Sequence, residues 1–403
     1  MMRPVSAIIL LFGLAAVQLP AAENRFVHAE GREIVAPDGH KLLLRGINLG
    51  NWLVPEGYMF HFDKGPASYR EISALFNNLI GPRETARFWK RYRANYITEA
   101  DIRFIRDAGF NSIRIPFHYA LIDDGTAFPL LDQVIAWCKE AHIWVILDMH
   151  CAPGGQTGTN IDDSWGYPWL FESEEEQQFA VAFWRSIAQR YADEPTVLGY
   201  DLLNEPIPPA VAQLNVYLEP LYRRITDAIR QVDKNHIVIL GGAQWDSNFS
   251  VFGPPIDPNA VYTFHKYWTA PTKDVIQSYL DFRERYQVPI WLGESGENQD
   301  SWIAQFRKML EKNDVGWAFW PYKKMDATSS AVSFARPVDW DEIVTFAALP
   351  AAMGAAEDLM KKRPSLEHSR AALEDLLEKI KIQNCRANPG YLQSLGMHVP
   401  VIQ

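Results

Sequence analysis

The sequence predicts an α/β fold, a closed (β/α)8 or TIM barrel with an N-terminal β-hairpin and a long insertion after its first strand. Three observations support this fold class. Eight short β-rich runs alternate with helical patterns along the chain. Two of these runs, residues 198–205 and 289–294, end in a glutamate, and barrels present functional side chains at strand ends. The 403 residues, 48% hydrophobic and 22% charged, are enough for one large core.

The predicted strands are short runs rich in β-branched, aromatic and aliphatic residues. They cover residues 42–47, 112–115, 144–149, 198–202, 237–240, 261–264, 290–292 and 316–319. The predicted helices between them cover residues 98–107, 130–141, 174–191, 211–231, 272–286, 301–312 and 339–348. Gly109 ends the first of these helices, and a Ser173/Glu176 capping box begins the third. Eightfold alternation favours a closed barrel over an open sheet.

Three segments lie outside this alternation. Residues 32–35 and 41–44 flank the turn Pro37-Asp38-Gly39 and predict a hairpin that leads into strand one and closes the barrel floor. Residues 48–97 form an aromatic-rich insertion with a helix at 82–92, and such insertions shape substrate clefts. A charged helical pattern at 365–381 is expected to pack on the outside of the barrel.

The N-terminus predicts export. Arg3 precedes an apolar run at residues 7–17 that is too short to span a bilayer, and Ala21 and Ala22 offer a cleavage point. We therefore expect residues 1–22 to be a signal peptide and residues 23–403 to form one domain. The mature protein would be secreted, extracellular or periplasmic, and would have no contact with a membrane. An uncleaved anchor is the alternative.

Composition and cysteine count exclude several functions. A net charge of −10 argues against a nucleic-acid partner, because phosphate binding needs clustered Lys and Arg. The 14 Trp residues exceed what a core of this size needs, and rings that stack on sugars would account for the surplus. Cys138, Cys151 and Cys385 are odd in number and widely spaced, so they predict no disulfide framework and no metal motif. Cys151, directly after a strand, is expected to be a small buried residue or to line the site.

Glu205 and Glu294 are the candidate catalytic pair. A retaining glycosidase needs one protonated carboxyl to donate to the leaving oxygen and one ionised carboxylate to attack the anomeric carbon. Glu205 suits the acid/base role and Glu294 the nucleophile. Strand ends would bring both to one barrel mouth, and a separation of roughly 5–5.5 Å would imply retention. Two ordinary ion-pair carboxylates are the alternative.

The chain resembles glycoside hydrolase family 5, the cellulase-related retaining β-glycosidases, from about Arg45 to Trp320. Seven short motifs in family order carry the resemblance. They are RGIN at 45–48, SIRIP at 112–116, DMH at 148–150, LNEP at 203–206, HKY at 265–267, LGE at 292–294 and WAFW at 317–320. The resemblance implies a β-linked oligosaccharide, polysaccharide or glycoside as substrate and no cofactor.

Three further positions have roles that can be argued physically. Arg114 ends strand two, where a guanidinium would keep Glu294 ionised and correctly turned. Asn204 precedes the acid and would hydrogen-bond the sugar 2-hydroxyl. Tyr267 is expected to donate its hydroxyl toward the nucleophile. The alternative for Arg114 is a surface salt bridge, for Asn204 a structural cap and for Tyr267 plain packing.

Two histidines and a tryptophan complete the candidate substrate-binding set. His150 and His265 both end strands, so zinc has to be weighed, but no HExxH motif or close ligand pair occurs. The family resemblance implies that both bind sugar hydroxyls, and no metal is expected. Satisfied core histidines are the alternative. Trp320 ends strand eight, where the resemblance implies a stacking floor beneath the sugar.

Substrate specificity is less constrained. GNWL at 50–53 and APGGQ at 152–156 are similar to the exo-β-1,3-glucanase branch, whereas SGEN at 295–298 and PYKK at 321–324 depart from it. We therefore expect a β-linked glucan or glucoside. Glu297, with Lys323 or Lys324, would bind sugar outside the cleavage site or form an exposed ion pair. Trp165, Tyr167 and Trp169 would line a leaving-group subsite or pack.

Three alternatives stay open. The enzyme could be an endo-β-1,4-glucanase, or the chain could be a catalytically silent carbohydrate-binding barrel. A metal-dependent barrel hydrolase would use His150 and His265. The sequence fixes neither linkage, nor endo or exo attack, nor oligomeric state.

Overall fold

The computed structural model describes residues 25–159, 162–349 and 356–402. The predicted signal peptide, residues 1–22, lies outside these described ranges. Within them, no helix combines the length and the apolar character that a membrane span requires.

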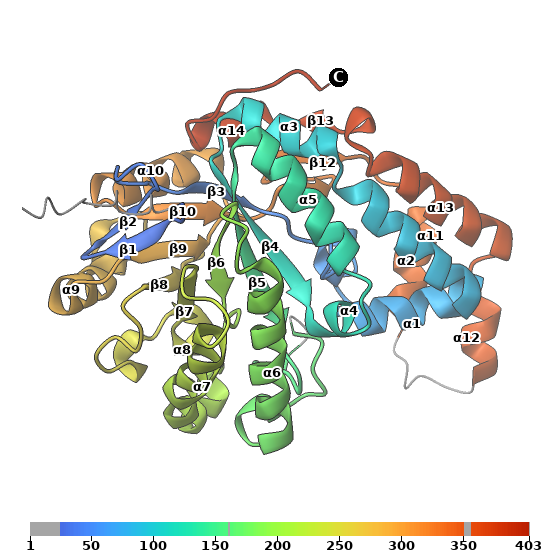
Figure 1. Ribbon diagram of the computed structural model, residues 1–403. Coiled ribbons are helices and arrows are strands. Elements are labelled where there is room, and N and C mark those ends of the chain that lie inside the picture. Colours follow the sequence, from blue (N-terminus) through green and yellow to red (C-terminus); the bar gives the residue numbers. More distant parts are fainter. Residues whose placement is uncertain (1–24, 160–161, 350–355, 403) are drawn as a thin grey trace, which may run out of the picture.

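Eight parallel strands close into a barrel (Figure 1). They are β3 (Arg45–Asn48), β4 (Ser112–His118), β5 (Trp144–Cys151), β6 (Val197–Asp201), β7 (Ile237–Gly241), β8 (Ala260–His265), β9 (Ile290–Glu294) and β10 (Gly316–Phe319). Each pairs with its neighbour in sequence, and β10 pairs with β3 to complete the circle. The eight predicted strands and the barrel are confirmed. Strands covered on both faces have continuous apolar runs, which is why the sequence revealed them.

Helices follow the strands and cover the barrel (Figure 1). They are α3 (Glu99–Ala108), α4 (Tyr119–Asp123), α5 (Phe128–Ala141), α6 (Glu174–Tyr191), α7 (Leu218–Arg230), α8 (Ala243–Asp246), α9 (Gln277–Tyr286) and α10 (Asp300–Lys312). Short 3-10 turns are η1 (Gly57–Phe60), η3 (Trp169–Phe171), η4 (Pro209–Tyr217), η5 (Phe249–Val251), η6 (Lys273–Ile276) and η7 (Ile382–Asn384). Gly109, at φ 101°, ends α3 as predicted.

The single helix predicted at residues 211–231 is wrong. The structure has η4 followed by α7, and the backbone at Val211 is not helical. Pro220 gives the reason, because proline lacks the N–H that an interior helical position needs. It is tolerated in the first turn of α7, which therefore begins at Leu218.

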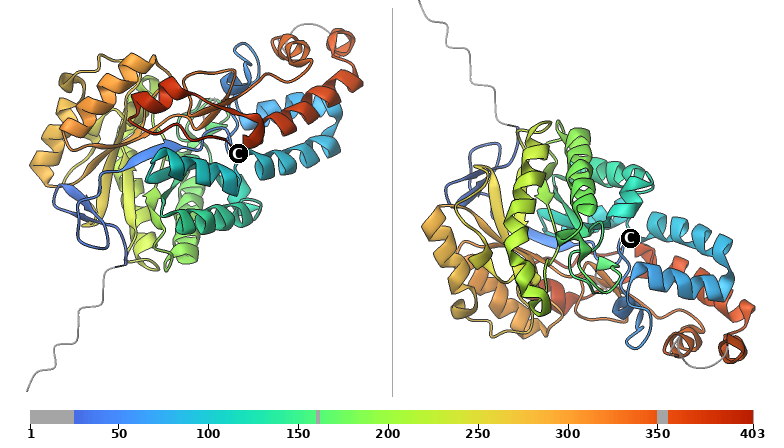
Figure 2. Two further views of the ribbon diagram at one scale, coloured as in Figure 1. Left: turned by 90° about the horizontal axis from the view of Figure 1, so that it is seen from above. Right: turned by 90° about the horizontal axis from the view of Figure 1, so that it is seen from below.

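The insertion after β3 forms a helical lobe beside the barrel. Its helices α1 (Tyr69–Ile80) and α2 (Pro82–Tyr96) pack against α13 (Leu366–Lys379), and Figures 1 and 2 show the three side by side. The sequence predicted only the helix at 82–92 here, although a Ser68/Glu71 capping box begins α1. Helix α13, which was expected on the outside of the barrel, thus packs on the insertion. Two more helices, α11 (Trp340–Ala347) and α12 (Ala356–Lys362), precede it.

The predicted hairpin is reduced to one bridge, and a second hairpin that the sequence did not predict lies directly before it. β1 (His28–Glu30) pairs with β2 (Glu33–Val35), and Gly31, at φ 56°, supplies the turn. The predicted partner segment forms one bridge, Val35 to Lys41, before it continues into β3. Val27 and Ile34 still pack on apolar side chains inside the barrel, so the hairpin closes the end where strands begin.

A small sheet that the sequence did not predict follows β10. It contains β11 (Lys323–Met325), β12 (Val332–Phe334) and β13 (Arg386–Ala387), and α14 (Pro389–Ser394) comes after it. β11 pairs with β12 in parallel, and β12 pairs with β13 antiparallel. This sheet holds the chain just after Trp320 beside the barrel mouth.

Candidate active site

A cavity of about 560 Å³ opens at the carboxyl ends of the barrel strands. Both candidate catalytic glutamates line it. Its other lining residues are Glu56, Tyr58, His150, Asn204, Trp245, Ser247, His265, Tyr267, Trp268, Glu297 and Trp320. The two strand ends identified in the sequence therefore meet in one hollow.

Glu294 is the last residue of β9 and is held by two donors. Nη1 of Arg114 donates to Glu294 Oε1 at 2.5 Å, and the Tyr267 hydroxyl donates to Oε2 at 3.0 Å. These two hydrogen bonds fix the orientation of the Glu294 side chain. The contacts predicted for Arg114 and Tyr267 are confirmed.

Arg114 is fully buried beneath the cavity and is the hub of the site. It donates through Nε to Asp201 at 2.8 Å, and Nη2 lies 3.1 Å from Asp148 Oδ1. Burial raises the pKa of Asp148 and of Asp201 to about 7, although the guanidinium acts in the opposite direction. The amide of Asn48 accepts from Nη1 and donates to the carbonyl oxygen of Gly293, which ties Arg114 to β9.

Glu205 lies four residues beyond β6 in a different environment. Its backbone is left-handed, at φ 47°, and its N–H donates to Asp246 Oδ2 at 3.0 Å. Nδ1 of His265 lies 2.9 Å from Glu205 Oε1, and no arginine or lysine forms an ion pair with Glu205 among the described residues. Burial raises the pKa of Glu205, although His150 and Arg114 lower it in part.

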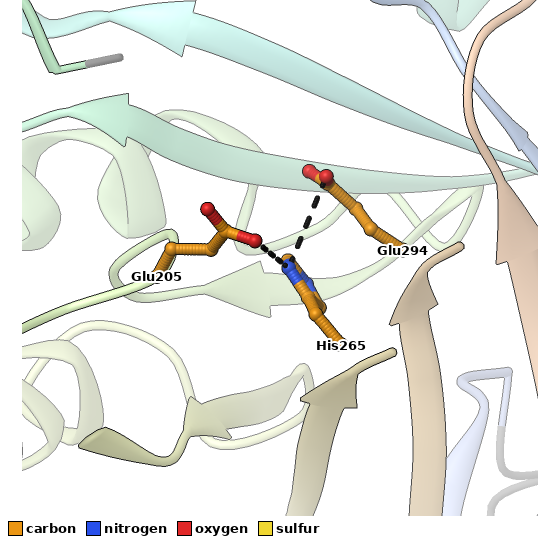
Figure 3. A group of neighbouring side chains, drawn as sticks. All are labelled: Glu205, His265 and Glu294. Carbon is orange, nitrogen blue, oxygen red and sulfur yellow. Dashed lines mark hydrogen bonds and ion pairs between the residues drawn. The ribbon is translucent and has the colours of Figure 1, made fainter. Parts of the chain in front are cut away.

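His265 lies between the two glutamates (Figure 3). Its Nδ1 lies 3.9 Å from Glu294 Oε2. One carboxylate oxygen of Glu205, one of Glu294 and a ring nitrogen of His265 all lie within 4.8 Å of one another. Burial lowers the pKa of His265 to about 3, so the ring is neutral. This short separation between carboxylate oxygens fits a retaining mechanism better than an inverting one, in which the two carboxyl groups lie roughly 6.5–9.5 Å apart.

His150, Asn204 and Trp320 also line the cavity. The His150 ring stacks on Trp320, with 5.7 Å between centroids, and its Nδ1 lies 2.8 Å from Asp148 Oδ2. Burial lowers the pKa of His150 to about 4. Asn204 accepts from Arg114 at 2.9 Å. A Cβ on Gly50 would lie 2.5 Å from the Trp320 ring, which explains glycine at this position.

All eight predicted site residues therefore lie together. Seven line the cavity, and Arg114 lies directly beneath them. The metal alternative required His150 and His265 to act together. The donor group that could hold an ion in this cavity, within the described part of the chain, is Glu205, His265 and Glu294, without His150.

Sequence reasoning missed several residues of the cavity wall. Glu56 and Tyr58 come from the insertion, and Trp245 and Trp268 from the loops after β7 and β8. Glu56 is buried, and burial together with nearby Glu294 raises its pKa well above the usual range. Within the insertion, Trp52 Nε1 donates to the carbonyl oxygen of Arg93 and the Tyr92 hydroxyl donates to that of Asn51, so the start of the insertion is held on α2. No local pattern marks such loops, because their convergence depends on tertiary packing.

The structure locates the residues near β11 and in the β5–α6 loop for which the sequence left two roles open. Lys324 pairs with Glu297 at 2.7 Å beside the cavity, and this pair is largely buried. Lys323 points away and pairs with Asp101 in the protein interior. Trp165 and Trp169 do not line the cavity of the two glutamates.

Comparison with known proteins identifies the family. The family model for cellulase, glycosyl hydrolase family 5, matches residues 75–326. The chain belongs to glycoside hydrolase family 5. It is a glycoside hydrolase, and membership together with the close carboxyl pair describes a retaining β-glycosidase.

Two relatives and a solved structure illustrate the range of similar family members. A β-xylosidase of Phanerodontia chrysosporium is 31% identical over 349 residues, 74% of this chain and 71% of that protein. A protein of Aspergillus fumigatus named "probable glucan 1,3-beta-glucosidase A" is 30% identical over 210 residues, 49% of each chain. The catalytic domain of endoglucanase Cel5A from Thermobifida fusca superposes with a TM-score of 0.53 at 17% identity. This superposition covers 89% of this chain and 97% of that domain, and it supports the barrel fold.

Proposed function

We propose that Glu294 is the nucleophile and Glu205 the acid/base of a double-displacement hydrolysis. The unequal environments of the two carboxyls carry this assignment. Glu294 accepts hydrogen bonds from Arg114 and Tyr267, which hold its two carboxylate oxygens in position for attack. Glu205 is largely buried beside a neutral histidine, so its raised pKa favours the protonated form that donates.

The reaction then runs in two balanced steps. A Glu294 oxygen forms a bond to the anomeric carbon while the bond to the leaving oxygen breaks, and Glu205 gives that oxygen its proton. Water next attacks the glycosyl-enzyme ester, Glu205 takes the water proton, and Glu294 leaves as a carboxylate. Asn204 and His150 bind sugar hydroxyls, and Trp320 supports the ring from below, as the resemblance implied.

The proposed substrate is a neutral β-linked glucan or glucoside, attacked from a chain end. The relatives are a β-xylosidase and a protein named as a glucan 1,3-β-glucosidase, so a β-xyloside is the second candidate. Glu56 and Tyr58 from the insertion occupy one side of the cavity, which favours a short binding pocket. Internal cleavage of β-1,4-glucan is the competing mode.

Azide rescue tests the assignment of Glu205. Glu205→Ala should be inactive on ordinary glycosides, because no acid protonates the leaving group, and azide should restore turnover of an activated aryl β-glycoside with a β-glycosyl azide product. Rescue of Glu294→Ala with an α-glycosyl azide would be the matching sign of a nucleophile. Full activity in either variant would contradict the mechanism.

A substrate panel tests specificity. Aryl β-glucosides and β-xylosides, together with β-1,3, β-1,4 and mixed-linkage glucans, should be compared by the length of their products. Single sugar units released from chain ends are expected, and a ladder of internal fragments would identify an endo-enzyme.

We also propose that the protein is secreted after cleavage near Ala22. The apolar run behind Arg3 and the small residues at the cleavage point support this proposal. N-terminal sequencing of protein recovered outside the cytoplasm should begin near residue 23. Recovered protein that still begins at Met1 would favour the uncleaved anchor.

A further inference from the structure

A second cavity lies at the same end of the barrel, between α1 and the loop that joins β5 to α6. Its volume is about 630 Å³, compared with about 560 Å³ for the cavity of Glu205 and Glu294. The two cavities share no lining residue. His118 at the end of β4 and Ala152 just after β5 line it, so the β5–α6 loop separates the two hollows.

Two large aromatic side chains line this cavity and remain open to solvent. Trp165 is 78% exposed and Trp169 is 49% exposed. The Arg70 guanidinium lies 3.4 Å from the centroid of Trp165 and covers one face of the ring. An indole held in this way presents a flat apolar surface with little loss of entropy on binding, and such surfaces suit the apolar face of a sugar.

Unpartnered polar side chains surround the aromatic pair. Asn77, Tyr119 and Glu176 line the cavity, and their side chains form no hydrogen bond within the described residues. The hydroxyl of Ser73 is buried without a partner, again counting described residues alone. An amide, a phenol and a carboxylate together provide donors and acceptors for several hydroxyl groups.

The other charged groups of the wall are used inside the protein. Asp163 lies 3.3 Å from His118 Nε2 and accepts the backbone N–H of Arg70 at 3.2 Å. Asp162 accepts the backbone N–H groups of Thr157 and Ser164, which fixes the loop. The cavity therefore offers no free cation for an anionic ligand, in the part of the chain that the structure describes, and a neutral polyhydroxylated ligand fits its groups.

We propose that this cavity is a second carbohydrate-binding site, which holds a neutral sugar unit of a β-linked glycan outside the catalytic cavity. The sugar ring stacks on Trp165, and its hydroxyls bond to Asn77, Tyr119 and Glu176. The choice of a sugar as ligand rests on the proposed function. The site would keep the enzyme on a polymer between cleavage events without taking part in bond breaking.

Affinity electrophoresis tests the proposal. Native gels containing laminarin, mixed-linkage β-glucan or xylan should retard the Glu294→Gln protein, in which polymer is not consumed. Adding Trp165→Ala or Trp169→Ala to this protein should weaken binding about tenfold, the size expected when an aromatic stacking surface is lost. Tyr217→Ala is the matched control, because Tyr217 is an exposed aromatic that lines neither cavity, and its mobility should not change.

Hydrolysis of a small aryl β-glycoside separates this site from the catalytic one. In the otherwise native protein, Trp165→Ala should leave kcat/KM within about twofold, because the small substrate reaches only the catalytic cavity. The proposal is overturned if Trp165→Ala leaves the mobility unchanged with every polymer that retards the parent, if no polymer retards the parent, or if this variant loses aryl-glycoside turnover. Absence of aryl-glycoside turnover in the native protein would instead contradict the proposed function, while the gels would still report on the second site.

Discussion

The floor and the rim of the catalytic cavity are built by different means. The floor lies on regular parallel strands and is almost fully buried. It consists of Asn48, Arg114, Asp148, Asp201 and Glu294. The rim consists of Glu56, Tyr58, Trp245, Trp268 and Glu297, which lie outside the barrel strands on the segments that connect them, Tyr58 within η1 and Trp245 within α8.

The backbones of the two parts differ as well. Trp245, Trp268 and Glu297 have φ values of 61°, 51° and 49°, in the left-handed region that non-glycine residues seldom adopt. Such strain persists only where the surrounding structure holds it in place. The reaction therefore depends on the register of the strands. Substrate choice depends on loops, which can change without disturbing that register.

The largest expected effect is a difference in kcat/KM between substitutions of two glutamates that lie three residues apart in sequence. Glu294→Gln removes the floor nucleophile and should lower kcat/KM by about 10⁴-fold or more. Glu297→Gln removes only a rim carboxylate and should change kcat/KM by no more than about tenfold, mainly through KM. Steady-state kinetics on one aryl glycoside, with both variants shown to be folded by circular dichroism, provide the measurement. Equal losses of kcat/KM in the two variants would contradict the distinction between floor and rim.

Arg114→Lys tests the hub of the floor. Lysine cannot reach Glu294, Asp201 and Asp148 with one planar fork, so buried carboxylates lose partners. We expect a loss of about 3–5 kcal/mol in unfolding free energy together with a fall in kcat of about 100-fold or more. Urea unfolding and steady-state kinetics measure the two effects.

Arg230→Lys is the matched control for Arg114. Arg230 forms a two-pronged pair with Asp257 away from the cavity, so its substitution should affect stability alone. A catalytic defect in this control, or normal catalysis in Arg114→Lys, would count against the hub.

The same contrast explains what the sequence could predict. Floor residues follow apolar strands in short motifs, so both their positions and their meeting point were predictable from periodicity and from the barrel rule. The rim was not predictable, because Glu56 and Trp268 are far apart in sequence and meet only through packing. Helix α1 was missed despite its capping box, and Pro220 should have excluded one helix across residues 211–231.

The pH profile should report Glu205 and not the rim. The raised pKa of Glu205 keeps its acid form populated to higher pH, so kcat/KM should fall as pH rises through that pKa. His150 and His265, with pKa values of about 4 and 3, are neutral well before this point and do not contribute. In Glu205→Ala on an activated glycoside with azide, the alkaline fall should disappear, whereas Trp268→Ala should keep it. Persistence of the fall in Glu205→Ala would assign it to another group.

The smallest expected catalytic effect is that of substituting Lys324, whose neighbour Lys323 on β11 serves as the comparison. Successive residues of a strand point to opposite faces, so Lys324 reaches Glu297 beside the cavity while Lys323 pairs with buried Asp101. Lys324→Met should raise KM a few-fold and cost less stability than Lys323→Met, because the rim carboxylate that it leaves unpaired next to the sugar is partly exposed. Lys323→Met should cost about 3–5 kcal/mol of unfolding free energy and leave kcat of the folded enzyme intact. If Lys324→Met instead lowered kcat as strongly as a floor variant, the rim would be part of the chemistry, and loops would set the reaction as well as the substrate.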